Sequence, residues 1–299
     1  MLLFFEPVEK PMVWGSESWT IGAHAHGDCK IKEGDFAGLT LSQLWRQQPE
    51  LFGHLDEEEF PLLIKLIETK EDLSLQVHPD DDYVVSNGEG MRGKAECWYI
   101  LECAEDATII LGHNAINREQ LTDMVMAGRW NELIREIPIH PGDFIQLDPG
   151  TIHSIKGGIR LLETQQNCDI TYRIFDFNRA SAGQQRELHI RQGLDVITVP
   201  SREDTVIQAR QNNANVRHKL YDGAYYIIWE MEVAGQAVID RDQSFLIICV
   251  IEGEGRIGTR PIGIGDHFIL TNGCDPIILA GNMKLIMSAP PLKERKVTF

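Results

Sequence analysis

A short motif occurs twice in the chain at one constant offset, and it constrains the fold more than any other feature. The motif runs over residues 139–150 and again over 262–273, with Ile, Gly, Asp, Leu and Gly at matching places. Each copy is a glycine-containing turn, a strand-like segment and a second turn. A repeat on this scale indicates two copies of one structural unit.

Short strand-like segments separated by glycine-rich turns fill most of the chain, so we predict a mostly β protein built from two related β-barrels. Upstream of the motif, residues 99–102 resemble residues 249–252. The chain between this segment and the motif is longer in the first copy, and the extra length coincides with a helical pattern near 117–135. We expect a first domain over residues 1–200 that carries this helical insertion. A polar linker over 201–217 and a second barrel over 218–299 would follow.

Composition narrows the class of partner. The chain has 299 residues, of which 43% are hydrophobic, and a formal net charge of -17, which argues against nucleic acid or an anionic membrane as partner. Neither a membrane-spanning apolar run nor a signal peptide is expected. Six scattered cysteines without a C-x-x-C motif are typical of reduced thiols. These features favour a cytoplasmic protein and leave an anionic small substrate open.

Two strand-like segments of the first domain carry unusual polar side chains on one face. Because side chains alternate along a strand, Ser74, Gln76 and His78 share a face in the first segment. Lys94 and Glu96 share a face in the second. If these faces converge, nitrogen and oxygen donors meet in one place.

His153, after a Pro-Gly turn, completes a donor set that suits zinc or another borderline divalent ion. The four candidate ligands are Gln76, His78, Glu96 and His153. The offset of the repeated motif places Pro276 where His153 lies, and the offset between the similar segments 99–102 and 249–252 places Leu246 where Glu96 lies. The second copy therefore lacks both ligands, and we predict a metal site in the first barrel alone.

A second polar cluster follows, with Glu163 and then Arg173 in strand-like segments. A two-residue hairpin at 157–158 would put Glu163 on the wrong face. A three-residue loop with a left-handed glycine would pair His153 with Glu163, and we predict this arrangement. Arg173 either forms a salt bridge with Asp176 or Glu163, or lines the pocket.

Five motifs, taken in order, resemble those of type I mannose-6-phosphate isomerases of the short bacterial form. The motifs occupy residues 60–65, 73–80, 93–99, 150–153 and 169–176. The resemblance is strong over the first two thirds of the chain and weak over the C-terminal barrel. It implies two cupin-type, jelly-roll β-barrels. It also implies a zinc-dependent aldose–ketose isomerase that interconverts mannose 6-phosphate and fructose 6-phosphate through an enediol(ate).

The resemblance also implies roles for single residues. One Zn²⁺ per chain would be bound by Gln76, His78, Glu96 and His153. Arg173 matches the catalytic arginine, and Ser74, Lys94 and Glu163 match further pocket residues. Arg173 would stabilise the enediolate, and Lys94 would assist near the sugar oxygens or the phosphate. Glu163 would carry the proton, with zinc-bound water or a histidine as rivals.

The cations that hold the phosphate are left open by the sequence. Lys65, Lys94, Arg92 and Arg173 are available, although Lys65 lies in an apolar strand where an acidic partner is the alternative. Two other functions are open as well. A redox metal cupin usually carries a His-x-His motif, whereas this chain has Gln76 two residues before His78. A non-catalytic sugar-phosphate sensor would not need both Arg173 and Glu163.

Overall fold

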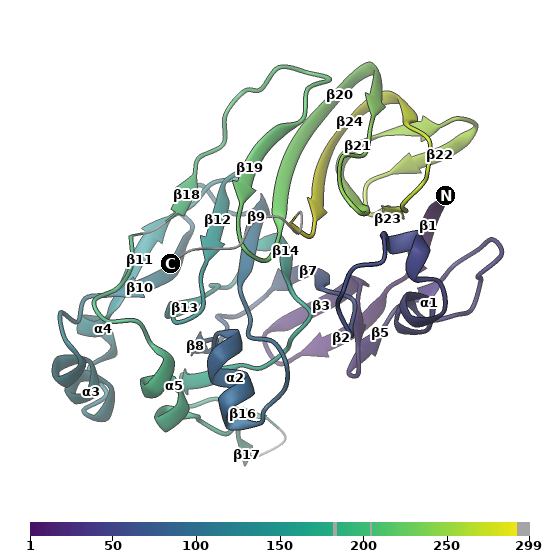
Figure 1. Ribbon diagram of the computed structural model, residues 1–299. Helices are drawn as coiled ribbons and strands as arrows, with labels where there is room; N and C mark the ends of the chain where they lie inside the picture. Colours follow the sequence, from purple (N-terminus) through teal and green to yellow (C-terminus); the bar gives the residue numbers. More distant parts are fainter. Residues whose placement is uncertain (182–183, 204, 292–299) are drawn as a thin grey trace. The chain divides into compact units, whose positions relative to one another are not determined.

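The computed structural model describes residues 1–181, 184–203 and 205–291 (Figure 1). The protein is mostly β, as the sequence predicts. The chain divides into two compact units that interleave along the sequence. Unit 1 comprises Met1–Val8, Trp19–Ile64 and the described residues from Arg210 onward, and unit 2 comprises Glu9–Ser18 and Lys65–Ala209. The expected division by a linker at 201–217 remains a prediction.

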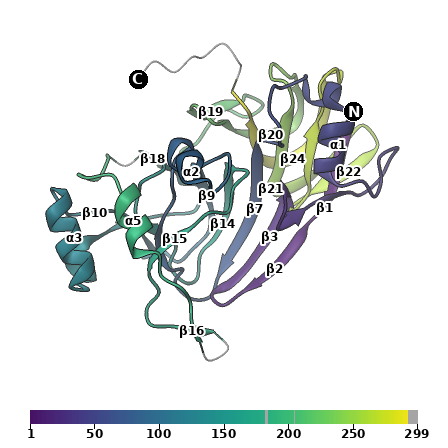
Figure 2. The same cartoon turned by 60° about the horizontal axis from the view of Figure 1, so that its bottom comes forward.

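Unit 1 contains one large antiparallel sheet and a short helical segment. Its elements are β1 (Leu2–Glu6), β4 (Ala23–His24), β5 (Gly27–Asp28), β6 (Lys30–Ile31), α1 (Leu41–Gln47), the 3-10 helix η1 (Pro49–Phe52), β19 (His218–Asp222), β20 (Ile227–Ile239), β21 (Leu246–Ile257), β22 (Arg260–Gly263), β23 (His267–Leu270) and β24 (Ile277–Ala289). The sheet has the order β19-β20-β24-β21-β23-β1-β6, with β22 beside β21. The long strands β20, β24 and β21 lie side by side (Figure 2). Their alternate apolar side chains form the core of this unit.

Unit 2 contains two sheets and the inserted helices. Its elements are β8 (Leu75–Val77), α2 (Asp81–Asn87), β9 (Glu96–Glu102), β10 (Thr108–His113), α3 (Arg118–Met126), α4 (Trp130–Leu133), β11 (Ile134–Pro138), β12 (Phe144–Leu147), β13 (His153–Ser154), β14 (Arg160–Gln166), β15 (Tyr172–Phe175), β16 (Ala180–Ser181), β17 (Gln184–Gln185), α5 (Ile190–Val196) and β18 (Thr205–Ile207). One sheet has the order β11-β10-β13-β8-β15. The other runs β18-β12-β9-β14 and continues into β7 (Leu62–Thr69), β3 (Gly15–Ile21) and β2 (Val8–Met12).

The sequence repeat has the same local structure in both units. Gly142 and Gly265 have φ angles of 91° and 88°, the left-handed region that glycine enters without strain. Asp143 and Asp266 each accept a hydrogen bond of 2.8 Å from the backbone N–H three residues upstream. β12 then pairs with β9, as β23 pairs with β21. The two copies of the motif therefore share a turn conformation and a strand pairing, and not only similar residues.

Apolar spacing and capping residues in the sequence predict helices over 40–48 and 117–127 and a further turn over 129–135, and all three are present. Two other helices were missed. Thr40 caps α1 in a capping box with Gln43, and the side chain of Asn117 caps α3 by accepting from the backbone N–H of Gln120 at 2.8 Å. The turn expected over 129–135 is α4, which continues directly into β11. α2 and α5 were not predicted, although α2 has an aspartate N-cap and a glycine C-cap.

The predicted pairing of His153 with Glu163 is wrong. β13 pairs with β8 and β10, where His153 lies opposite Gln76 and Leu111, whereas Glu163 in β14 lies opposite Trp98 in β9. Both edges of β14 are occupied, by β9 and β7, so β13 has no edge to join. Gly158 does adopt a left-handed φ of 82°, but the loop passes the chain from one sheet to the other.

No helix in the described part of the chain is long and apolar enough to cross a membrane. The six cysteines form no disulfide within the described residues, and four of them are buried.

Candidate metal centre

Two histidines and a glutamate from three strands meet in the interior of unit 2. His78 follows β8 directly, Glu96 begins β9 and His153 begins β13. Each of the three is at most 2% exposed. Nε2 of His78 lies 3.4 Å from Oε2 of Glu96, and Nε2 of His153 lies 3.3 Å from Oε1. Both imidazoles therefore face the two oxygens of one carboxylate, and their donor atoms are close enough together for one ion.

Backbone carbonyls fix how the two imidazole rings face the cluster. Nδ1–H of His78 donates to the carbonyl oxygen of Ile170, and Nδ1–H of His153 donates to that of Thr151, both at 2.9 Å. A carbonyl only accepts, so each ring carries its proton on Nδ1 and presents the lone pair of Nε2 to the cluster. Hydrogen bonds of this kind, from Nδ1–H to a backbone carbonyl, are typical of histidines that bind a metal through Nε2.

Gln76 places its amide beside His153. The amide nitrogen lies 3.2 Å from Nε2 of His153, and the amide oxygen accepts from the hydroxyl of Ser74 at 3.3 Å. In this arrangement the amide N–H donates to the histidine lone pair. Rotating the amide by 180° exchanges its two ends and presents the carbonyl oxygen as a fourth donor. The structure thus brings together all four residues that the sequence nominated.

The buried carboxylate of Glu96 needs a positive charge beside it. Neither oxygen of Glu96 accepts an aligned hydrogen bond from the described residues, although both are buried. The positive charge is supplied by Lys94, whose Nζ forms an ion pair with Oε2 of Glu96 at 2.8 Å and lies 3.1 Å from Nε2 of His78. Two imidazoles, a carboxylate and an amide fit zinc, which prefers nitrogen and oxygen ligands in a small coordination shell.

The electrostatics of the cluster favour the metal-binding protonation states. Burial and the charge of Lys94 lower the pKa of His78 to about 3, and burial lowers the pKa of His153. Burial opposes ionisation of Glu96, but Lys94 and His78 hold its pKa well below the usual range. At neutral pH both histidines are therefore neutral and the carboxylate is charged, as metal binding requires.

These shifts predict that the metal-free protein loses stability in acid. The pKa of His78 is about 6.5 when unfolded and about 3 when folded, so the unfolded chain binds the proton first as the pH falls. The contribution of His78 to the free energy of unfolding is fully present above pH 6.5 and is lost as the pH falls towards 3. For this one proton, the free energy of unfolding falls by up to about 1.4 kcal/mol per pH unit. Urea unfolding of chelated protein between about pH 7.5 and 5 measures this. His78→Gln should flatten the dependence, and a flat profile for the unsubstituted chain would contradict the prediction.

Glu163 lies in an ion-pair network beside the cluster. Its Oε1 is 3.0 Å from Nζ of Lys65, which also lies 3.6 Å from Glu17, and its Oε2 accepts from Nε1–H of Trp98 at 3.1 Å. Burial and the charge of Glu96 raise the pKa of Glu163, although Lys65 opposes them. The acidic partner that the sequence suggested for Lys65 is therefore present.

Trp98 connects Glu163 to the histidines. Its ring meets that of His153 edge-on, with centroids 5.6 Å apart, while its Nε1–H binds Glu163. Sequence reasoning missed Trp98. The signal was its place in β9, two residues after Glu96, because residues two apart share a strand face.

Arg173 lies on β15, directly opposite Gln76 in β8. Its Nη1–H donates to the carbonyl oxygen of Glu187 at 3.1 Å. Among the described residues no ion pair joins Arg173 to Asp176 or Glu163, the two partners that the sequence suggested. Asp176 is bound instead by Arg179 and Arg186.

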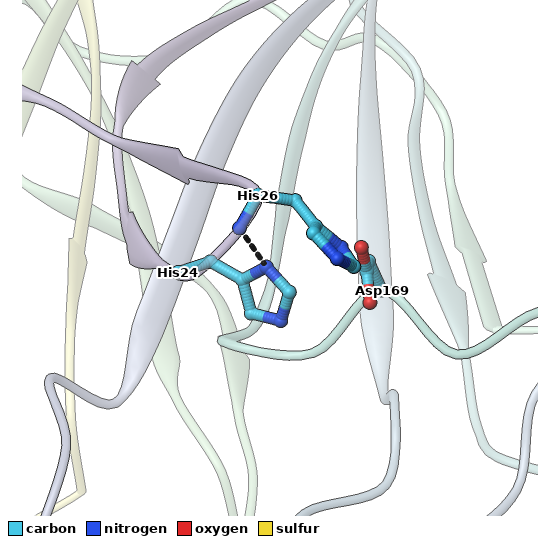
Figure 3. Close-up of side chains that lie close together, drawn as sticks. All are labelled: His24, His26 and Asp169. Carbon is cyan, nitrogen blue, oxygen red and sulfur yellow. Dashed lines mark hydrogen bonds between the residues drawn. The ribbon is translucent and has the colours of Figure 1, made fainter.

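Two further histidines lie close together in unit 1, on the β4–β5 hairpin (Figure 3). The backbone N–H of His26 donates to Nδ1 of His24 at 3.2 Å, and the ring centroids are 5.1 Å apart. The sequence assigned no ligand role to either residue. Their His-x-His spacing around a tight turn was the signal for their proximity.

Comparison with known proteins identifies the class. A model described as the mannose-6-phosphate isomerase cupin domain matches residues 218–290, so the chain contains a cupin domain. A model described as the phosphomannose isomerase type I catalytic domain matches residues 7–105. The chain belongs to the type I phosphomannose isomerase family and is an isomerase.

Several relatives resemble the chain over nearly its whole length. Mannose-6-phosphate isomerase ManA of Bacillus subtilis is 40% identical over 308 residues, covering 96% of this chain and 98% of the relative. The mannose-6-phosphate isomerase of Streptococcus mutans is 36% identical over 277 residues, covering 91% of this chain and 87% of the relative. The crystal structure of the Bacillus subtilis mannose 6-phosphate isomerase superposes with a TM-score of 0.88 at 36% identity, covering 96% and 99% of the two chains. A zinc-bound mannose 6-phosphate isomerase shares the fold at 13% identity, with a TM-score of 0.76 over 97% of this chain and all of the other.

Proposed function

We propose that this isomerase is zinc-dependent and interconverts mannose 6-phosphate and fructose 6-phosphate. One Zn²⁺ per chain would be held by Gln76, His78, Glu96 and His153. The observation that carries the proposal is the convergence of two neutral imidazoles on one buried, ionised carboxylate. Relatives named as mannose-6-phosphate isomerases support the substrate, and zinc-bound neighbours of the same fold support the metal.

The proposal extends to the architecture. Each unit would be a jelly-roll barrel of the cupin type, and unit 2 would carry α3 and α4 as its insertion. The common turn and strand pairing at 139–150 and 262–273 support this relationship. Only the first copy retains the donor residues, so one barrel would be catalytic and the other structural.

The reaction moves a proton between the two carbons next to the sugar's carbonyl group. Bound zinc would supply Lewis-acid polarisation of the substrate's oxygens. Glu163 would take the proton from C2 of the aldose and return it to C1 of the enediolate, since a raised pKa suits a group that must accept and release it. Lys65 and Trp98 hold its two oxygens in place.

Positive and polar side chains would stabilise the charge that develops on the sugar oxygens. Arg173 keeps its charge at every working pH and donates from a rigid plane, which suits an enediolate oxygen. Lys94 and Ser74 lie against the donor cluster and would donate to neighbouring hydroxyl groups of the sugar. Burial of Lys94 and Ser74 strengthens their interactions, because few waters screen them.

Removal of the metal tests this function. We expect purified protein to convert mannose 6-phosphate to fructose 6-phosphate, to stop after dialysis against a chelator and to recover when zinc is restored. A coupled assay measures turnover, and elemental analysis measures the metal. Full turnover in protein shown to be metal-free would contradict the proposal. Oxygen uptake would identify a redox cupin instead, and binding without turnover would identify a sensor.

A further inference from the structure

A buried glutamine on β14, Gln165, has an amide oxygen to which no described residue donates a hydrogen bond. The side chain is 0% exposed. Its Nε2 group donates to the backbone carbonyl oxygen of Gln166, at 3.0 Å, and to that of Cys168. A carbonyl oxygen only accepts, so these two contacts fix which end of the amide is the nitrogen. The other end, Oε1, is therefore a buried acceptor without a hydrogen-bond partner among the described residues.

Gln165 lies on the face of β14 that is turned to the candidate metal centre. It comes two residues after Glu163 and lies directly opposite Glu96 in β9. Side chains two apart on a strand share a face, and directly opposite residues share a face with their Cβ atoms about 4.5–5.5 Å apart. Leu161, on the same face, belongs to the apolar core of unit 2. The face therefore changes from apolar to polar where it reaches the donor cluster.

The second copy of the repeated unit shows that the fold does not need an amide at this place. The offset that relates β9 to β21 in the sequence makes the pairing of β9 with β14 correspond to that of β21 with β24. Met287 and Ala289 then take the places of Glu163 and Gln165. Both belong to the apolar core of unit 1. The polar pair in unit 2 therefore indicates a function of the site and not a requirement of packing.

The free amide oxygen of Gln165 needs a donor from outside the described chain. Burial of a carbonyl oxygen without a hydrogen bond is unfavourable, because the group has given up its hydrogen bonds to water. The neighbouring cation Lys94 does not fill this role, since its Nζ is paired with Glu96 and lies 3.1 Å from Nε2 of His78. A hydroxyl group of a bound sugar is a donor of the right chemistry.

The charge on an amide oxygen limits which sugar hydroxyl it fits. Oε1 carries a partial negative charge, so it would repel a sugar oxygen on which negative charge develops as the enediolate forms. It fits a hydroxyl that keeps its proton throughout the reaction. The first such hydroxyl is on C3, next to the two carbons that exchange the carbonyl group. A hydrogen bond of equal strength in the ground state and the transition state lowers KM and leaves kcat almost unchanged.

We propose that Oε1 of Gln165 accepts a hydrogen bond from the C3 hydroxyl group of the sugar phosphate and that this contact contributes to the choice of substrate. The inference rests on the proposed function, because it places the reacting carbons between the donor cluster and Glu163. Nε2 of Gln165 holds the amide in place through the two backbone carbonyls. A sugar without this hydroxyl leaves the acceptor unpaired, and a site built to bind a hydroxyl group rejects such analogues.

Pairing a substitution with a deoxy sugar tests the contact on the zinc-loaded, full-length protein. For the unsubstituted protein, 3-deoxymannose 6-phosphate should have a KM about tenfold or more above that of mannose 6-phosphate, the effect of an unpaired buried acceptor. Gln165→Met should raise KM for mannose 6-phosphate by a similar factor at nearly unchanged kcat, and should abolish the penalty for the 3-deoxy sugar. The penalty for 4-deoxymannose 6-phosphate should be the same in both proteins.

Binding and metal content give readouts that do not depend on turnover. Mannitol 6-phosphate has the C3 hydroxyl but no carbonyl group, so it cannot isomerise. Calorimetry should show that Gln165→Met binds it about tenfold more weakly than the unsubstituted protein does. Elemental analysis should show unchanged zinc in the variant.

Gln146→Met is the matched control. Gln146 is also a buried glutamine on a strand of unit 2, β12, and its Nε2 group donates to Asp148 at 3.2 Å. Its neighbours Ile145 and Leu147 belong to the core of the unit, so its own side chain is on the other face of the strand. This variant should keep the unsubstituted KM values and the unsubstituted affinity for mannitol 6-phosphate.

The outcomes separate this inference from the proposed function. Equal KM for mannose 6-phosphate and its 3-deoxy analogue in the unsubstituted protein would overturn the contact, whether or not Gln165→Met folds. A 3-deoxy penalty that persists in Gln165→Met, or a loss of zinc in that variant, would also overturn it and would leave Gln165 a structural role. If the unsubstituted protein fails to isomerise mannose 6-phosphate, the proposed function fails, and calorimetry with mannitol 6-phosphate still decides whether Gln165 binds the hydroxyl group.

Discussion

Replacing His153 by alanine should leave the protein almost without zinc and should lower turnover of mannose 6-phosphate by more than about 100-fold. Loss of a group that merely orients a ligand typically costs 10–100-fold in metal affinity or activity, so loss of a ligand should cost more. The substitution also removes one of the two neutral imidazoles that face Glu96. Elemental analysis after dialysis measures the zinc, and a coupled assay measures the turnover.

His113→Ala is the matched control. His113 is also buried in unit 2 and also makes a ring hydrogen bond to a backbone carbonyl, from Nε2 to Thr198 at 2.9 Å. That variant should lose stability for the same packing reasons but should retain its zinc. Stoichiometric zinc in a folded His153→Ala protein would remove His153 from the ligand set. Equal zinc loss in both variants would show that disruption of the unit, and not a missing ligand, was responsible.

The parts of the fold that follow local rules could be predicted from the sequence. The left-handed Gly142 and Gly265 and the capping aspartates beside them are determined by a few neighbouring residues. The helix at Asn117 begins where a side-chain cap and an apolar stripe coincide. α2 shows the same signals at Asp80 and Gly88 but is too short for a clear apolar period, and so it was missed.

The parts of the fold that depend on pairing between distant strands could not be predicted. Strand alternation put Gln76 and His78 on one face correctly, because period two is a local property. The neighbour of His153 was predicted wrongly, since the choice of β8 rather than β14 depends on which edges are already occupied. The hairpin prediction considered only the loop at 157–158, whereas both edges of β14 are taken by β7 and β9.

The candidate site shows the same division. Each of the four nominated donors was recognisable as a polar residue on a strand face, and the structure brings all four together. Trp98 was not recognisable, because an apolar residue on a buried strand is normally part of the core. Its link between His153 and Glu163 arises only when β9 lies between β12 and β14. The arginines around Asp176 also converge only through tertiary contacts.

Replacing Arg173 by alanine should leave the zinc content unchanged but reduce kcat by about 100-fold or more, the loss expected when one preorganised donor to a developing negative charge is removed. The structure supports the separation of these effects. Within the described residues, the side chain of Arg173 donates to Glu187 and forms no hydrogen bond or ion pair with the donor cluster, although its backbone lies opposite Gln76. Elemental analysis and steady-state kinetics on the same preparation measure both quantities.

Arg202→Ala is a suitable control, because Arg202 is an exposed arginine of the same unit, and Asp148, at 3.4 Å, is its only ion-pair partner among the described residues. Removal of such a surface pair should alter turnover little. Arg173→Lys discriminates further, because lysine restores the charge but not the planar fork, and should recover only part of kcat. Near-normal kcat in Arg173→Ala would exclude Arg173 from enediolate stabilisation, whereas loss of zinc in that variant would make it a support for Gln76 and the metal centre.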